Sequence, residues 1–140
     1  MALRKKTASE AQIQAAFFEH LSLLHPAIRR VSFHIPNGGK RSITEGAMLK
    51  RCGVVSGVPD VFIAVPAHGL HGLFIEFKAG KNTATDNQKE MMRLFTKQGY
   101  YCQICYSEES ALDALNDYLR GKLCQDSTII NSAPPSSNQL

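Results

Sequence analysis

Residues 58–80, VPDVFIAVPAHGLHGLFIEFKAG, combine two sheet-like apolar runs with charges that a sheet interior rarely holds. Asp60 precedes the first run, VFIAV, and Glu76 and Lys78 lie inside the second, LFIEFK. Alternate residues of a strand share a face, so Glu76 and Lys78 project together near the end of their strand. Because buried ionised side chains are costly without partners, these residues are expected to face a compensating charge or ion.

The two runs are predicted to be neighbouring strands of a hairpin, over residues 60–65 and 72–78, joined by PAHGLHG. If they are antiparallel, Asp60 lies beside Glu76 and Lys78. Two converging carboxylates repel each other unless a cation sits between them, and hard oxygen ligands favour Mg²⁺ or Mn²⁺ over zinc. A neighbouring lysine can hold an attacking water or stabilise charge on a phosphate. Together with basic surroundings, this arrangement predicts phosphodiester hydrolysis.

The rest of the chain predicts helices around a mixed sheet. Helical spacing predicts a helix over residues 8–24, with Thr7 and Glu10 as its capping box and Pro26 as its stop. The next predicted elements are a strand over residues 27–35, the turn PNGGKRS and a short helix from a Thr44 cap to residue 51.

Three further elements follow the hairpin. Thr85 and Gln88 form a capping box for a helix that reaches residue 98, before a strand over residues 100–106. Ser107 caps a last helix, which Gly121 closes. Its apolar face is predicted to use Leu112, Leu115 and Leu119. The fold class is therefore α/β, a mixed sheet flanked by helices.

The 140 residues are predicted to form one domain over residues 1–123, followed by a flexible polar tail over residues 124–140. No apolar run approaches the roughly 20 residues that span a membrane, and the first residues lack the apolar core of a secretory signal. We therefore expect a soluble, unexported, cytoplasmic protein with no membrane partner.

The four cysteines favour a structural role in a reducing compartment. Cys102 and Cys105 spell C-x-x-C, but they lie in a predicted strand. Residues three apart on a strand point to opposite faces, so the pair is not expected to chelate zinc or to form a redox centre. His68 and His71, in a glycine-containing loop, are read as solvent-exposed rather than metal-binding.

The net charge of +4 is unevenly distributed. Residues 1–70 hold nine Lys/Arg and four Asp/Glu, whereas residues 71–140 hold seven and eight. The basic groups cluster at Arg4-Lys5-Lys6, Arg29-Arg30, Lys40-Arg41 and Lys50-Arg51. Such clusters suit a polyanion along one side of the molecule, although a solvated surface would look similar. GGKRS does not match a P-loop and is read as a basic loop that contacts DNA.

Asp60 with Glu76-Phe77-Lys78 resembles the signature of the PD-(D/E)XK nucleases, which have a restriction-endonuclease-like core. GVPDVFIAV, GLFIEFKAGKNTATDNQKEMMRLFTKQGY and the N-terminal SEAQIQ are more narrowly similar to the VRR-NUC branch, the virus-type replication-repair nucleases. The resemblance covers about residues 8–120. It implies a nuclease that needs Mg²⁺ or Mn²⁺ but no small-molecule cofactor, and in-line attack of an activated water that leaves a 5′-phosphate. The resemblance further implies a homodimer that acts on branched DNA such as four-way junctions, as stand-alone members of the family look to be. It also suggests a phage source.

The resemblance also implies roles for individual residues. Asp60, Glu76 and the Phe77 carbonyl would bind the metal, and Lys78 would orient or activate the water. Glu10 matches the acidic residue that completes the site, with Glu19 on the same predicted helix as its rival. Gln88 matches a positioning polar residue, although capping alone would explain it. Predicted phosphate contacts come from a larger basic set: Lys40, Arg41, Lys50, Arg51 and Lys81.

The residues leave other functions open. A DNA-binding module on the same fold without catalysis, and a nuclease of linear duplex DNA, are the alternatives to a nuclease of branched DNA. Asp60 as a turn residue, and Glu76 with Lys78 as a plain ion pair, are the corresponding structural alternatives.

Overall fold

The structure is a computed structural model that describes residues 7–123. The predicted Arg4-Lys5-Lys6 cluster, Cys124 and the predicted tail lie outside the described residues. The elements follow in the order α1 (Glu10–Leu24), α2 (Pro26–Arg29), β1 (Ser32–His34), α3 (Ile43–Arg51), β2 (Val61–Ile63), β3 (Leu73–Phe77), α4 (Asp86–Lys97), β4 (Tyr101–Cys105) and α5 (Glu108–Arg120). None of the helices within residues 7–123 combines the length and apolar character that crossing a bilayer requires.

The four strands form one mixed sheet in the order β1-β2-β3-β4. Strands β1, β2 and β3 pair antiparallel, and β4 pairs parallel with β3. The predicted hairpin between the two runs of residues 58–80 is therefore confirmed. Strand β3 is the most enclosed, since all five of its residues are buried.

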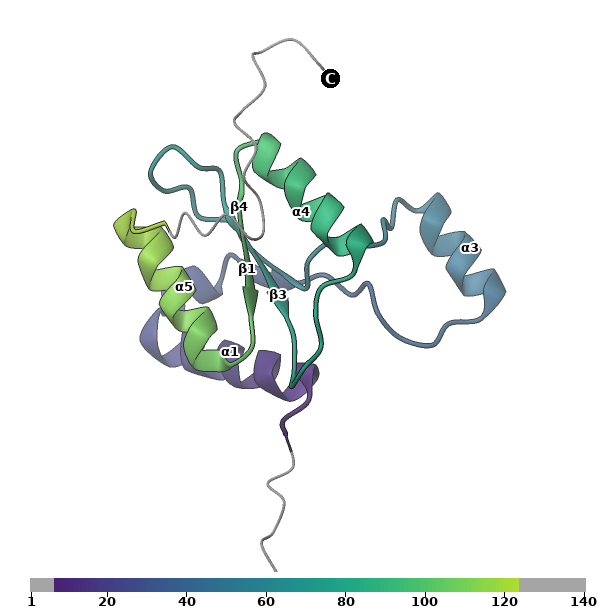
Figure 1. Cartoon of the computed structure of the whole chain (residues 1–140), viewed down its shortest axis with the longest axis horizontal. Helices are drawn as coiled ribbons and strands as arrows, with labels where there is room; N and C mark the ends of the chain where they lie inside the picture. The colour runs from purple at the N-terminus through teal and green to yellow at the C-terminus, as the bar shows by residue number, and fades with distance from the viewer. Residues whose placement is uncertain (1–6, 124–140) are drawn as a thin grey trace, which may run out of the picture.

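Helices cover both faces of this sheet (Figure 1). Helices α1 and α5 pack on one face, where Phe17 and Leu115 meet Ile75 and Phe77 of β3. Helix α4 covers the other face, where Met92 packs near Phe74. Alternate side chains of β3 thus lie in two separate hydrophobic cores, as the sequence pattern predicts. The architecture is the expected α/β sandwich of helix, sheet and helix layers.

The capping box of α1 differs from the predicted one. Ser9, not Thr7, is the N-cap, and its partner is Gln12 rather than Glu10. The Ser9 hydroxyl accepts from the Gln12 N–H at 3.2 Å, and the Gln12 side chain accepts from the Ser9 N–H at 2.9 Å. The prediction was wrong because both pairs have the same spacing. The consequence is that Glu10 is free of capping.

The predicted strand over residues 27–35 is also corrected. Residues Pro26–Arg29 form the short helix α2, and the strand is confined to Ser32–His34. Proline is well suited to the first position of a helix because it needs no N–H there and its φ is already helical. The guanidinium of Arg29 lies 4.7 Å from the centre of the Phe18 ring, which ties α2 to α1.

Residues 38–57, which we call the arm, carry α3 away from the body of the protein (Figure 1). Its cap is Ser42, paired with Glu45, and not the predicted Thr44. The helix has no buried residue, and Ile43 is 94% exposed. Two hydrogen bonds close the root of the arm, from Asn37 to the Val58 carbonyl at 3.0 Å and from Asn87 to the Ser56 hydroxyl at 3.0 Å.

His68 and His71 are exposed, as predicted, and they also hold the β2–β3 loop against the rest of the protein. His68 Nε2 lies 2.9 Å from the Leu119 carbonyl oxygen, near the end of α5. The two histidines pack closely against glycines. A side chain at Gly121 would collide with the His68 ring, and a side chain at Gly99 would collide with the His71 ring. These contacts attach the loop to the ends of α5 and α4, so both histidines have structural roles.

The last helix and the cysteines follow the sequence pattern with small changes. The residues of α5 that are fully buried are Ala111, Leu115 and Tyr118, while the predicted Leu112 and Leu119 pack at the border of the core. Cys102 and Cys105 lie in the two different cores, so they face opposite sides of the sheet as expected. Burial raises the pKa of each thiol to about 12, which keeps both protonated and unreactive.

Replacing Phe17 with alanine tests the α1 side of the core. Phe17 is fully buried and lies against Phe77, with ring centres 5.7 Å apart. Phe17→Ala should lower the free energy of unfolding by about 3–5 kcal/mol, measured by urea denaturation. Leu24→Ala, on the same helix at 60% exposure, should change it by no more than about 0.5 kcal/mol. Equal effects of the two substitutions would contradict this packing.

Candidate active site

The β2–β3 register brings Asp60 to Glu76. Val61 pairs with Ile75, so extending the antiparallel register by one residue sets Asp60 opposite Glu76. The Phe77 N–H donates to Asp60 Oδ2 at 2.8 Å, which fixes the carboxylate against the end of β3. Asp60 is therefore more than a turn residue, and the predicted convergence with Glu76 is present.

The Asp60 carbonyl is held by contacts from the end of β1 and the residue after it. The Asp60 carbonyl accepts from the Ile35 N–H at 2.7 Å and from His34 Nδ1 at 2.8 Å. Sequence reasoning missed His34, although its place at the end of a strand beside an acidic neighbouring strand was a usable signal. These bonds attach the start of β2 to the edge strand and leave the Asp60 carboxylate to face Glu76.

Glu76 is a buried carboxylate at 2% exposure. Its Oε1 accepts from Lys78 Nζ at 2.7 Å and from Gln88 Nε2 at 2.6 Å. Its Oε2 is also buried, and it has no hydrogen-bond partner within the described part of the chain. Glu76 and Lys78 do form the ion pair that was the structural alternative, yet this pair leaves one oxygen without a partner.

Gln88 makes one contact that fits each of the two roles that the sequence left open. Its Oε1 accepts from the Thr85 N–H at 2.9 Å and completes the capping box of α4. Its Nε2 donates to Glu76. One side-chain amide thus joins the start of α4 to the buried carboxylate, and capping and positioning are compatible.

The pKa values of the three ionisable groups are all raised. Burial raises the pKa of Asp60 and of Glu76, against the lowering effect of their hydrogen bonds. Burial alone would lower the pKa of Lys78, but its bond to Glu76 and the surrounding negative charges raise it overall. The site thus holds two carboxyl groups whose ionised forms are poorly solvated, beside a lysine that stays protonated.

Glu10, and not Glu19, lies at this site. The charge of Glu10 contributes to the raised pKa of Asp60 and of Lys78. Its Oε1 accepts from Asn82 Nδ2 at 3.1 Å, a contact from the β3–α4 loop that sequence reasoning missed. A hollow of about 340 Å³ has both Glu10 and Asp60 in its wall. Glu19 is exposed and does not line this hollow.

Comparison with known proteins agrees with this geometry. The model of the VRR-NUC domain family matches residues 8–109. A solved structure described as a VRR_NUC domain protein superposes with a TM-score of 0.72 and 26% sequence identity, over 82% of this chain and 91% of that one. The comparison with curated proteins found no match to this chain.

The chain belongs to the VRR-NUC family. Its fold is the restriction-endonuclease-like α/β core expected from the resemblance. As a VRR-NUC chain it is a nuclease-type domain, for which DNA is the natural ligand.

The donor set of this VRR-NUC site suits a hard divalent cation. Asp60 and Glu76 supply carboxylate oxygens, and Glu76 Oε2 is buried with no hydrogen-bond partner among residues 7–123. Phe77 can contribute only its backbone, because its side chain is fully buried in the core. Within residues 7–123, no three His, Cys, Asp or Glu side chains converge as one cluster, so Glu10 does not form a three-carboxylate group with Asp60 and Glu76.

The predicted DNA-contacting residues lie in two places. Four are on the arm: Lys40, Arg41, Lys50 and Arg51. Lys81 follows β3 in the β3–α4 loop, three residues beyond Lys78. All five are exposed, and Arg41 donates to the Pro36 carbonyl at 2.8 Å, which holds it near the root of the arm. The basic residues thus come from two segments, one before Asp60 in the sequence and one after Lys78.

Removing Lys78 tests whether the buried charges are coupled. In chelator, Lys78→Met should lower the free energy of unfolding by on the order of 3 kcal/mol, because it leaves the Glu76 charge buried without its counter-ion. The double variant Lys78→Met/Glu76→Gln should lose less than the sum of the two single variants, measured by urea denaturation.

A surface pair provides the control. Arg93 and Glu90 form an ion pair on α4, and Arg93→Met should hardly change stability. Strict additivity of the Lys78 and Glu76 substitutions would show that the two groups do not depend on each other.

Proposed function

We propose that this VRR-NUC chain is a metal-dependent DNA endonuclease. The observation that carries the proposal is the convergence of Asp60, Glu76 and Lys78 around a buried carboxylate oxygen that has no partner in the described chain. An unsatisfied buried carboxylate oxygen is costly, and a cation beside it offsets that cost. A purely structural ion pair would not require Asp60 to be fixed against the same strand end.

Each residue of the site would have a distinct role in the reaction. Asp60, Glu76 and the Phe77 carbonyl would hold Mg²⁺ or Mn²⁺, with Glu10 completing the site. The bound ion would make water more acidic and neutralise charge that develops on the phosphate. Lys78, held by Glu76, would orient the attacking water for in-line displacement, leaving a 5′-phosphate and a 3′-hydroxyl. Gln88 would act as a positioning residue, since it donates to Glu76.

We propose branched DNA as the substrate, including four-way junctions. The basic groups of the arm and Lys81 would contact phosphates, which position a backbone without specifying its sequence. A homodimer would present two sites to paired strands, because a two-fold axis repeats the same site on each subunit. The proposed place of action is the cytoplasm, within an infected host if the source is viral.

The catalytic proposal is tested with a panel of labelled linear, splayed and four-way DNAs. The wild type should cut the branched substrates in Mg²⁺ or Mn²⁺ and not in chelator. Asp60→Asn and Lys78→Ala should each reduce cutting by at least about 100-fold while binding persists, since they remove proposed metal-binding and water-orienting groups. Mn²⁺ should also raise the melting temperature of the wild type and not of Asp60→Asn.

Two helix α1 variants form a matched pair in this assay. Glu10→Gln should impair cutting, whereas Glu19→Gln, nine residues further along the helix, should not. A wild type that binds but never cuts would leave a non-catalytic DNA-binding module. Cutting of linear duplex as fast as of a junction would indicate an ordinary duplex nuclease. Linearisation of a cruciform plasmid needs two cuts, so persistent nicking would argue against a working dimer.

The arm predicts the salt dependence of binding. Lys50→Gln/Arg51→Gln should weaken binding to all DNAs alike and reduce the slope of log affinity against log salt by about 2, as two phosphate contacts are lost. The control is Arg120→Gln/Lys122→Gln, which makes the same charge change at the C-terminal end of α5, whose last residue is Arg120. Equal slopes for the two double variants would remove the arm from the DNA-binding surface.

A further inference from the structure

The loop between β3 and α4 connects the parts of the candidate site. Lys78, its first residue, donates to Glu76, and Gln88, just beyond its end, donates to the same carboxylate. Between these two, Asn82 donates from Nδ2 to Glu10 Oε1 at 3.1 Å. One short segment therefore contacts both the buried carboxylate of β3 and the acidic residue at the start of α1.

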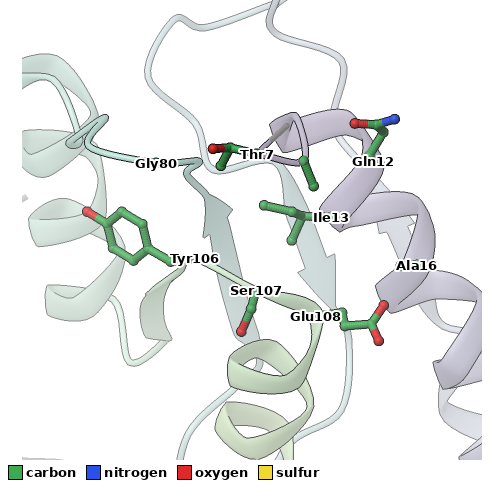
Figure 2. A pocket seen from close by; sticks show the side chains of 9 residues that line it. Thr7, Gln12, Ile13, Ala16, Gly80, Tyr106, Ser107 and Glu108 are labelled. Carbon is green, nitrogen blue, oxygen red and sulfur yellow. The ribbon is translucent and has the colours of Figure 1, made fainter. Parts of the chain in front are cut away.

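A tight turn fixes the position of Asn82 within this loop. The Ala79 carbonyl accepts from the Asn82 N–H at 3.1 Å, and Gly80, the second residue of the turn, has a φ of +58°. Glycine adopts this left-handed backbone without strain. Figure 2 shows Gly80 beside Thr7, and a methyl group at Gly80 would lie 4.0 Å from the Thr7 side chain. The turn thus lies against the start of α1, where Glu10 is the first helical residue.

The Glu10 carboxylate has few restraints apart from Asn82. Because Gln12 completes the cap of α1, the Glu10 side chain has no capping role. Among residues 7–123, the Asn82 amide is its one hydrogen-bond donor, and Oε2 has none. A half-exposed glutamate has several accessible rotamers, and a bond that selects one of them lowers the entropy cost of binding a ligand there.

Glu10 is close to the other carboxylates without being grouped with them. Its charge contributes to the raised pKa of Asp60 and of Lys78, and Glu10 and Asp60 line the same hollow of about 340 Å³. Within the described residues, however, Glu10, Asp60 and Glu76 do not form a three-carboxylate group. Hydrogen bonds at the end of β3 hold Asp60 and Glu76. The direction of Glu10 depends instead on the loop.

We propose that Asn82 is a positioning residue that holds Glu10 toward the cation of the candidate site. This inference rests on the proposed function, in which Glu10 completes that site. Carboxylates that bind metal ions are commonly hydrogen-bonded themselves, and loss of such an outer partner typically costs about 10- to 100-fold in metal affinity or activity. The Asn82 amide takes one oxygen of Glu10 and leaves Oε2 for the cation.

The test measures the affinity for Mn²⁺ by calorimetric titration, without DNA, on protein freed of metal by chelator. Asn82→Ala should bind Mn²⁺ about 10-fold more weakly than the wild type. Asn82→Gln, which keeps the amide, should bind it more tightly than Asn82→Ala does. Because Asn82 is exposed, both variants should fold normally. Asn87→Ala is the matched control, since it removes another exposed amide, bonded to Ser56, and should leave the Mn²⁺ affinity unchanged.

A double-variant cycle separates positioning of Glu10 from a general effect of the loop. In a Glu10→Ala background, Asn82→Ala should cause no further loss of Mn²⁺ affinity, because the carboxylate that it positions is gone. An equal loss in both backgrounds would overturn the inference. So would an unchanged Mn²⁺ affinity of the single variant Asn82→Ala, or a wild type that binds no Mn²⁺.

The titration distinguishes this inference from the proposed function. A wild type whose Mn²⁺ affinity depends on Asn82 in this way, but which cuts no DNA, would refute the hydrolytic proposal and retain the positioning role. A wild type that cuts branched DNA, while Asn82→Ala binds Mn²⁺ as tightly as the wild type, would do the reverse.

Discussion

Glu76 is a charged residue near the end of the most enclosed strand, and the arrangement around it depends on satisfying that charge. Lys78 from the same strand and Gln88 from α4 both bind its Oε1. Asp60 is fixed against the following residue, Phe77, by a backbone hydrogen bond. Replacing these contacts with apolar packing would cost the fold little, since buried ion pairs seldom add net stability. Their cost is understandable if the oxygen left unpaired is reserved for a cation.

Two helices place polar groups at the site from their first turns, Glu10 near Asp60 and Lys78, and Gln88 on Glu76. Glu10 is the first residue of α1, and Gln88 is the third of α4. With Thr7 as the N-cap of α1, Glu10 would be the third helical residue, and its carboxylate would be expected to bond the cap N–H. Because Ser9 is the N-cap and Gln12 its partner, the Glu10 carboxylate is left to bond Asn82 beside the site. The caps of α1 and α4 therefore help to determine the geometry of the site.

The hairpin and its charged residues were predictable from the sequence because strand alternation is a short-range rule. Once residues 58–80 are read as two antiparallel strands, Asp60, Glu76 and Lys78 must converge. The cap of α1 was not predictable in this way, since Thr7 and Ser9 both have Glu or Gln three residues later. The cap of α3 was predictable, because Ser42 has Glu45 three residues later, whereas Thr44 has Ala47. His34 and Asn82 were missed because their contacts join distant segments. Local patterns identify the strand pair, and tertiary packing selects among equivalent caps.

The arm shows the opposite balance between local and tertiary forces. Helix α3 has nine residues, includes Gly46, and buries none of its side chains. Isolated helices shorter than about 12–15 residues are marginal in water, so packing within this chain does not account for its stability. Its root is held by Asn37 and Asn87, while its tip presents basic groups and the exposed Ile43. A polyanion along Lys50 and Arg51 would relieve their mutual repulsion at the end of the helix. If the proposed DNA contacts form, the partner that stabilises the arm would be the DNA, whereas the Asp60–Glu76 pair is held within the fold by the contacts of β2, β3 and α4.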